Sequence, residues 1–242
     1  MAARRITRRG CHARGPLSLV GYSLRSIGGT PVWLINHDYH DSQGRAVPNA
    51  LQYTHSWANN SYPGSAPSDV DIRLMIMSRF GSKYPPSDST SYAAFTGPTV
   101  NLGGNFGSGG YCAYRNKFSY FNGISYVTEY VVMPHASSAP SCTPAVNGCN
   151  HTPNADVPAD IVVSPLSHLL EETVTDPRLN AWYDSAHPGQ ENADTCDWTW
   201  GTRYAAGNGS QANVTVGSTH FLIQRNWKFG PVRSTQIGCA MK

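Results

Sequence analysis

A histidine and a glutamate four residues apart are the pair in this sequence best suited to bind a metal ion. His168 and Glu172 lie in the run 159–177, ADIVVSPLSHLLEETVTDP. If that run is helical, residues four apart project from nearly the same face, about 40° apart at ~100° per residue. One helix then offers an imidazole nitrogen and a carboxylate oxygen to one ion, and both atoms suit Zn²⁺. A surface hydrogen bond uses the same spacing, so the pair alone leaves both interpretations open.

Proline positions predict the helix that must carry this pair. Pro165 suits the first turn with Ser164 as the N-cap, and Pro177 ends the helix, which leaves about ten helical residues between them. The apolar side of this helix is formed by Leu166, Leu169, Leu170 and Val174.

The sequence around the predicted helix is strongly acidic. From Asp156 to Asp197 there are nine acids and one base, Arg178. A stretch with this excess of negative charge is expected to attract cations. The acidic composition and the His168/Glu172 pair therefore point to the same part of the chain.

Basic residues concentrate at the other end of the 242-residue chain. The first 25 residues hold six arginines and no acid, so the formal net charge of +3 changes to −3 when they are left out. We predict a disordered Arg-rich leader over 1–27 and a single domain over 28–242, with no nucleic-acid partner. The apolar stretch after the first arginines is short and broken by Gly and Ser, so it makes a poor signal peptide. The sequence has no apolar run near the ~20 residues that span a membrane.

The first part of the domain is predicted to be rich in strands. Alternation predicts a hairpin of two strands, 31–40 and 45–54, around a turn at 41–44. Ser68 is expected to cap a helix that ends near Gly81. Further strands are predicted at 92–100, 111–121 and 124–133, with a Gly-rich loop at 103–110.

The second half of the chain carries a series of motifs in a fixed order. The run DIVVSPLSHLLEETVTDPRLNAWYD is followed by Glu191-Asn192-Ala193-Asp194-Thr195-Cys196, then by FLIQRNW and a final Cys239. This order and spacing resemble the EXORDIUM-like (phosphate-induced) family of secreted proteins. The segments PVWLINHDYHDSQG and SDVDIRLMI resemble that family's hairpin and following helix, so the resemblance covers about residues 28–241.

The resemblance implies a fold of the α+β or α/β class, a metallopeptidase-like (zincin-like) mixed sheet with a few helices and disulfides. The family has further strands before the hairpin, and this chain shows none there. An HExxE-type helix is implied, with Zn²⁺ as cofactor, His168 as first ligand and Glu172 as second. The third ligand is Glu191 or Asp194, and Asp176 is a ligand or supports one.

Leu169 departs from the family pattern at the residue that matters most for catalysis. The family has there the glutamate that takes a proton from metal-bound water. Glu171 is the nearest substitute base in the sequence. It projects about 80° to one side of the mean His168/Glu172 direction, whereas position 169 projects about 80° to the other side. We expect a degenerate site that keeps its metal, with peptide hydrolysis lowered by ~10² to 10⁴.

The six cysteines contain no C-x-x-C spacing, which favours disulfides over a metal or redox site. The predicted bridges are Cys142–Cys149, which closes a short loop, and Cys196–Cys239, which would fasten the last strand beside the site. Cys112 is either free or paired with Cys11. Four N-glycosylation sequons begin at Asn59, Asn150, Asn208 and Asn213.

Two classes of function remain. The first is a secreted, wall- or matrix-associated protein (cell wall or apoplast) that acts in growth or extracellular signalling, with a structural metal site. Such a protein would bind a glycan or protein partner through exposed aromatic residues such as Trp182, Tyr183, Trp198 and Trp200. The second is a zinc-dependent extracellular hydrolase that uses a non-standard base. Leu169 favours the first class.

Overall fold

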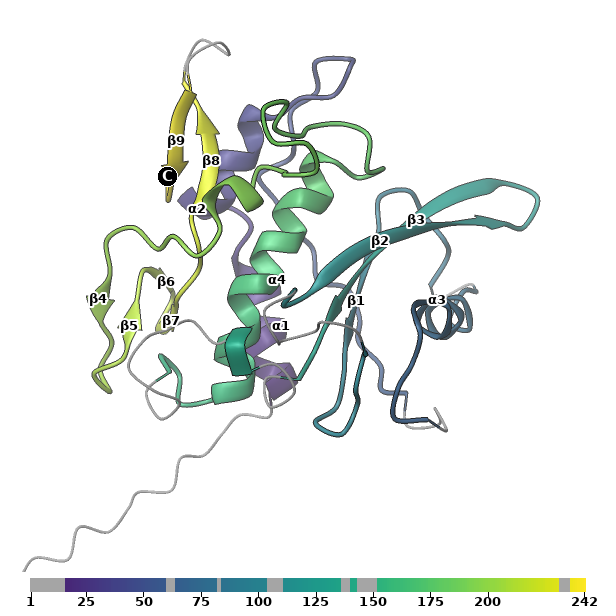
Figure 1. Ribbon diagram of the computed structural model, residues 1–242, viewed down its shortest axis with the longest axis horizontal. Coiled ribbons are helices and arrows are strands. Elements are labelled where there is room, and N and C mark those ends of the chain that lie inside the picture. Colours follow the sequence, from purple (N-terminus) through teal and green to yellow (C-terminus); the bar gives the residue numbers. More distant parts are fainter. Residues whose placement is uncertain are drawn as a thin grey trace, which may run out of the picture.

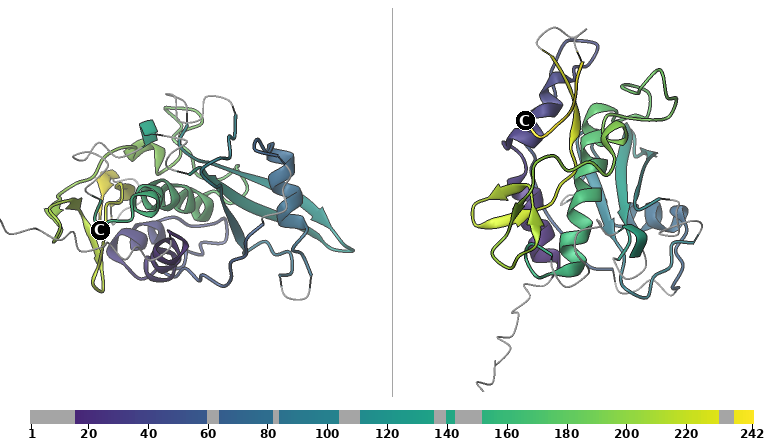
Figure 2. Two further views of the ribbon diagram at one scale, coloured as in Figure 1. Left: turned by 90° about the horizontal axis from the view of Figure 1, so that it is seen from below. Right: turned by 60° about the vertical axis from the view of Figure 1, so that its left-hand side comes forward.

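One long helix, α4 (Val157–Thr175), lies between a three-stranded sheet and helix α1 (Pro16–Ser26) (Figure 1). Helix α3 (Asp69–Met77) covers the opposite face of the sheet, which gives the layer order α1, α4, sheet, α3 (Figure 2). The structure, a computed structural model, describes residues 16–59, 64–81, 84–103, 111–135, 140–142, 152–230 and 236–242.

Shorter elements complete the fold. The short helices are α2 (Pro31–Leu34) and the 3₁₀ turns η1 (Ile35–Asp38), η3 (Pro140–Cys142) and η4 (Asp194–Cys196). The strands are β1 (Ser91–Phe95), β2 (Tyr114–Phe121), β3 (Ser125–Met133), β4 (Tyr204–Ala205), β5 (Gln211–Ala212), β6 (Val214–Val216), β7 (Thr219–Phe221), β8 (Asn226–Phe229) and β9 (Gln236–Ala240).

The main sheet has the order β1-β3-β2, with β3 parallel to β1 and antiparallel to β2. Strand β3 alternates between two cores because successive side chains point to opposite faces. Val131 and Met133 pack in the core shared with α1 and α4, whereas Tyr130 and Val132 pack in the core under α3. The later strands form three separate two-stranded pairs. The strands predicted at 92–100, 111–121 and 124–133 are confirmed as β1, β2 and β3, and so is the α+β class.

Helix α3 begins where its sequence predicts. The side chain of Ser68 accepts a hydrogen bond from the Asp71 amide, and the Asp71 side chain accepts one from the Ser68 amide. This reciprocal capping box satisfies two of the amide groups that a helix start leaves without partners.

The hairpin predicted over 31–54 is wrong. Thr30 caps a short helix with Pro31 in its first turn, and η1 continues it. The buried residues Val32, Trp33, Ile35 and Asn36 follow helical spacing, which can resemble alternation over ten residues. Of the hairpin, the turn at 41–44 remains, with an isolated bridge between His40 and Ala46.

The disordered leader predicted over 1–27 is wrong for its last part, and residues 1–15 lie outside the described ranges. Residues 16–26 form α1, which packs along α4. Leu19, Val20 and Leu24 are buried in the core, and the Arg25 guanidinium lies 4.5 Å from the centre of the Tyr53 ring. The arginine-based prediction overlooked the apolar spacing that begins at Pro16.

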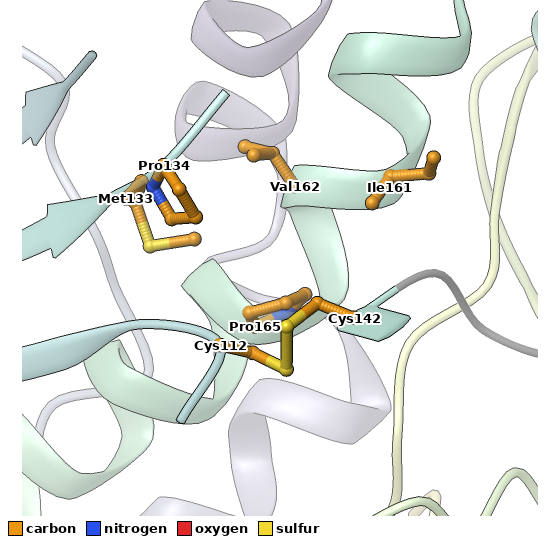
Figure 3. Close-up of a pocket in the computed structure, with 7 residues that line it drawn as sticks. All are labelled: Cys112, Met133, Pro134, Cys142, Ile161, Val162 and Pro165. Atoms are coloured by element: carbon orange, nitrogen blue, oxygen red, sulfur yellow. A yellow bond between two sulfur atoms is a disulfide. The ribbon is translucent and has the colours of Figure 1, made fainter. Parts of the chain in front are cut away.

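Helix α4 begins at Val157, just over two turns before the predicted start at Pro165. Asp156 is the N-cap, and its side chain accepts a hydrogen bond from the Ala159 amide. Pro165 lies inside the helix, beside a disulfide that joins Cys112 to Cys142 (Figure 3). The C-terminal end was predicted correctly, because α4 stops at Thr175, just before Pro177.

Gly28 should be required where α1 turns into α2. A Cβ atom there would clash with the Leu51 backbone nitrogen, and the backbone cannot move away at low cost. We expect Gly28→Ala to lower the free energy of unfolding by about 1–3 kcal/mol. Urea denaturation measures this, with Gly81→Ala as the control because nothing lies within 4 Å of a Cβ there. Equal stability of the two variants would contradict the close approach of Gly28 to the Leu51 backbone.

Candidate metal centre

Three side chains from α4 and η4 bring their donor atoms to one point. His168 Nε2 lies 2.7 Å from Glu172 Oε1 and 3.2 Å from Asp194 Oδ1. Within the described residues, one donor atom from each of these three forms a group in which all separations are below 4.8 Å. The structure therefore brings together the two predicted helical ligands and Asp194, one of the two candidates for the third.

Asp194 is oriented by its own loop. Its Oδ2 atom accepts a hydrogen bond from the Glu191 amide at 3.0 Å, which leaves Oδ1 facing His168. The 3₁₀ turn that carries it ends at Cys196, whose disulfide to Cys239 ties the turn to β9. The predicted Cys196–Cys239 bridge is confirmed.

Charge in the cluster shifts the pKa values of its members. Burial alone lowers the pKa of His168, but the neighbouring carboxylates of Glu172 and Asp194 outweigh it and raise this pKa well above its usual value. Burial raises the pKa of Asp194, and the hydrogen bonds from His168 and from the Glu191 amide bring it below its usual value. The neighbouring carboxylates therefore favour the protonated, positively charged form of His168.

One buried oxygen of the cluster faces His168 without a well-aligned hydrogen bond. The Glu172 side chain is 5% exposed, and its Oε1 atom accepts no hydrogen bond of acceptable geometry despite its proximity to His168. Two ligand atoms on a tetrahedral zinc ion lie about 3.3 Å apart, given bond lengths of ~2.0–2.1 Å. The separation of 3.2 Å matches this value, and the separation of 2.7 Å requires a small rotation of one side chain. The donor set of one imidazole and two carboxylates therefore fits zinc.

Arg115 on β2 is the central residue that the sequence did not reveal. Its side chain is 7% exposed, and its Nε atom lies 3.3 Å from Glu172 Oε2 and 3.1 Å from Glu191 Oε2. Its Nη2 atom also contacts Glu191 Oε1, and its Nη1 atom donates to the Asp176 carbonyl at 2.9 Å. The excess of acids over 156–197 indicates that a basic residue from elsewhere in the chain pairs with them. Sequence spacing does not identify which basic residue this is.

Glu191 and Asp176, two of the five predicted ligands, lie with Arg115 and not with His168. Burial is the main cause that raises the pKa of Glu191 to about 7, opposed by its hydrogen bond with Arg115. Asp176 is the C-cap of α4, and its Oδ1 accepts the amides of Asn180 and Ala181 at 2.6 Å each. Asp176 thus supports the end of the helix that carries Glu172.

Neither position 169, where the family pattern has a glutamate, nor the candidate base Glu171 is suitably placed for a general base. Leu169 is buried in the core with α1 and β3. Glu171 is completely buried, and its Oε1 accepts a hydrogen bond from the Ser167 hydroxyl at 3.2 Å. Burial raises the pKa of Glu171 to about 8, so this carboxyl holds its proton at neutral pH. Asp197 next to η4 is exposed as a residue, but partial burial of its carboxyl raises its pKa, and the nearby His168 charge opposes this rise.

The predicted Cys142–Cys149 bridge is wrong, because Cys142 pairs with Cys112. Antiparallel pairing of β2 with β3 brings the start of β2 next to the end of β3, so the segments before and after the two strands meet. Closeness in the sequence is therefore a poor guide to the disulfide partner of Cys142. The disulfide, Pro165 and the end of β3 line a small apolar cavity (Figure 3). Cys11 and Cys149 lie outside the described residues.

The predicted glycosylation sites differ in their surroundings. The Asn213 amide nitrogen donates to the carbonyls of Trp200 and Ile223, at 2.7 and 2.6 Å, so the folded chain does not offer it to a glycan. Asn59 and Asn208 are exposed and stay predicted sites, although Asn208 Nδ2 donates to the Thr152 carbonyl at 2.8 Å. Asn150 lies outside the described residues.

The four aromatic residues suggested for partner binding divide into two groups. Trp182 packs against Tyr39 and Phe229, with ring centres 5.3 and 6.0 Å apart. Tyr183 is exposed, and so is Trp198, whose ring centre lies 6.1 Å from that of the partly buried Trp200.

Comparison with known proteins shows what the segment around this site is similar to. Residues 133–221 match the phosphate-induced protein 1 conserved region, a segment that contains α4 and η4. Over this segment the chain is similar to the EXORDIUM-like (phosphate-induced) family. An 87-residue part is 33% identical to protein EXORDIUM-like 3 of Arabidopsis thaliana and covers 31% of this chain and 26% of that relative. The chain thus matches about a quarter of the EXORDIUM-like relative's length.

No solved structure matches the chain, so the zincin-like architecture stays a prediction. The three clustered donors lie inside the family segment, whereas Arg115 lies before it. Among the described helices, none combines the length and apolar character needed to cross a membrane.

Leu169→Glu tests whether this position belongs to the metal site or to the core. We expect it to lower the free energy of unfolding by several kcal/mol, because it buries a carboxyl without a partner. Leu74→Glu on α3 is the matched control, since Leu74 is 54% exposed. A Leu169→Glu variant as stable as the control, with new chelator-sensitive peptide hydrolysis, would show that position 169 faces the metal.

Proposed function

We propose that this EXORDIUM-like chain is a secreted, wall- or matrix-associated protein that binds one zinc ion through His168, Glu172 and Asp194. It acts in growth or extracellular signalling by binding a partner, and the metal fixes the loop that presents the partner surface. Bound zinc would supply a divalent charge that holds α4 and η4 together.

The convergence of His168 Nε2, Glu172 Oε1 and Asp194 Oδ1 carries this proposal, because the buried Oε1 atom has no well-aligned hydrogen bond. Burial of such an atom is costly unless something donates to it or coordinates it. The surrounding charges add support, because Glu172, Asp176, Glu191 and Asp194 face a single guanidinium and one imidazole. A divalent cation would offset this excess of negative charge.

Binding rather than catalysis is favoured because neither of the positions first considered supplies a base. Position 169 holds a buried leucine, and the candidate base Glu171 is buried away from solvent. The alternative, a zinc-dependent hydrolase with a non-standard base, would have to use the carboxyl of Asp197, an exposed residue. Chelator-sensitive hydrolysis of a peptide library, lost in Asp197→Asn, would support this alternative.

Exposed aromatic rings next to the cluster support a partner surface for a glycan or a protein. Trp198 is 42% exposed and adopts a positive φ of 55°, a conformation that costs about 1–3 kcal/mol outside glycine. It follows Asp194 by four residues, so zinc bound at Asp194 would also steady this loop.

Zinc binding is the test. The folded chain, stripped of metal and titrated with zinc by calorimetry, should bind about one ion. His168→Ala should weaken binding by more than the ~10–100-fold that the loss of a supporting residue costs, because it removes a ligand. His187→Ala is the matched control, since His187 also pairs with a nearby acid, Asp184, at 2.7 Å but is exposed. A folded wild type without zinc affinity, or equal affinities of the two variants, would refute the proposal.

A further inference from the structure

Arg115 contacts three carboxylates that surround the candidate metal centre, and the contacted atoms differ from one carboxylate to the next. It engages Glu191 through both carboxylate oxygens. It engages Asp176 through the carbonyl and through Oδ2, at 2.9 and 3.5 Å. It touches Glu172 at Oε2 alone, which leaves Oε1 directed at His168.

The result is a division of the acidic residues into two groups. Glu191 and Asp176 have their oxygens occupied by the guanidinium or by backbone amides. Glu172 and Asp194 each keep one oxygen for His168. A planar guanidinium can hold several oxygens at once in fixed directions, which the compact ammonium group of a lysine cannot.

We propose that Arg115 is a positioning residue that determines which carboxylates reach the cation and thereby sets the metal preference of the site. This inference rests on the proposed zinc site. With Arg115 in place, the donors are one nitrogen and two oxygens, a set suited to zinc. Without it, Glu191 is released and can add carboxylate oxygens.

A richer oxygen set changes which ion binds best. Hard cations such as Mn²⁺ and Ca²⁺ prefer six or more oxygen ligands, including carboxylates. Zinc accepts four ligands, including imidazole. Removal of Arg115 should therefore weaken zinc binding and strengthen manganese binding. A merely structural arginine would weaken both ions together.

The experiment compares zinc, cobalt and manganese binding by the wild type, Arg115→Lys and Arg115→Met. We expect Arg115→Met to bind zinc about 10–100-fold more weakly and to raise the manganese-to-zinc affinity ratio at least about tenfold. The zinc affinity and the manganese-to-zinc affinity ratio of Arg115→Lys should lie between those of the wild type and Arg115→Met. The visible absorption of bound cobalt should weaken in Arg115→Met as oxygen ligands are added. Arg73→Met is the control, because Arg73 pairs with Asp69 on the α3 side of the sheet.

A double variant separates positioning from a loss of folding. Arg115→Met/Glu191→Gln removes the released carboxylate together with the arginine, so it leaves less unpaired buried charge than Arg115→Met. The manganese-to-zinc ratio should return toward the wild-type value in this double variant. A raised ratio that persists in it would overturn the role given to Glu191 and with it the inference.

Failure of the inference and failure of the proposed function give different results. Zinc binding by the wild type with an unchanged metal ratio and cobalt spectrum in Arg115→Met overturns the inference alone. No binding by the wild type overturns both. If Arg115→Met binds zinc and the wild type does not, the inference and the proposed function are both overturned. The guanidinium would then occupy the place of the cation in the wild type.

Discussion

The pairing of Arg115 with the acidic end of α4 is the interaction on which the candidate site depends. Burial of an ion costs several kcal/mol unless partners compensate it, and loss of one partner of a buried pair costs about 3–5 kcal/mol. One guanidinium contacts Glu172, Asp176 and Glu191, while His168 contacts Glu172 and Asp194. Four acids against two basic groups leave negative charge to be offset, and this imbalance makes the cluster suitable for a cation.

The scaffold follows from the same constraint. The register of β2 against β3 places Arg115 opposite Val131, on the face of the sheet that meets α4. Adjacent residues of α4 then have opposite roles, since His168 joins the charged cluster and Leu169 joins the apolar core. The Cys196–Cys239 disulfide holds η4 in place beside them. A catalytic glutamate at position 169 would therefore lie in the core, which agrees with a binding role.

Local signals in the sequence predicted the parts of this arrangement that depend on near neighbours. The Ser68 cap, the three main strands, the end of α4 and the His168/Glu172 pair all rest on spacing within a few residues. The start of α4 was missed because Pro165, usually a first-turn residue, is tolerated inside a helix packed on both sides. Arg115 and the Cys112–Cys142 bridge depend on strands pairing across the sheet, so no local pattern reveals them.

The most direct test of this account is a crystal structure of the zinc-soaked protein, with anomalous diffraction measured on both sides of the zinc absorption edge. The account predicts one anomalous peak bonded to His168 Nε2, Glu172 Oε1 and Asp194 Oδ1, with Arg115 still paired to Glu191. A map without a peak at these atoms, or a peak coordinated by Glu191 in the wild type, would contradict it.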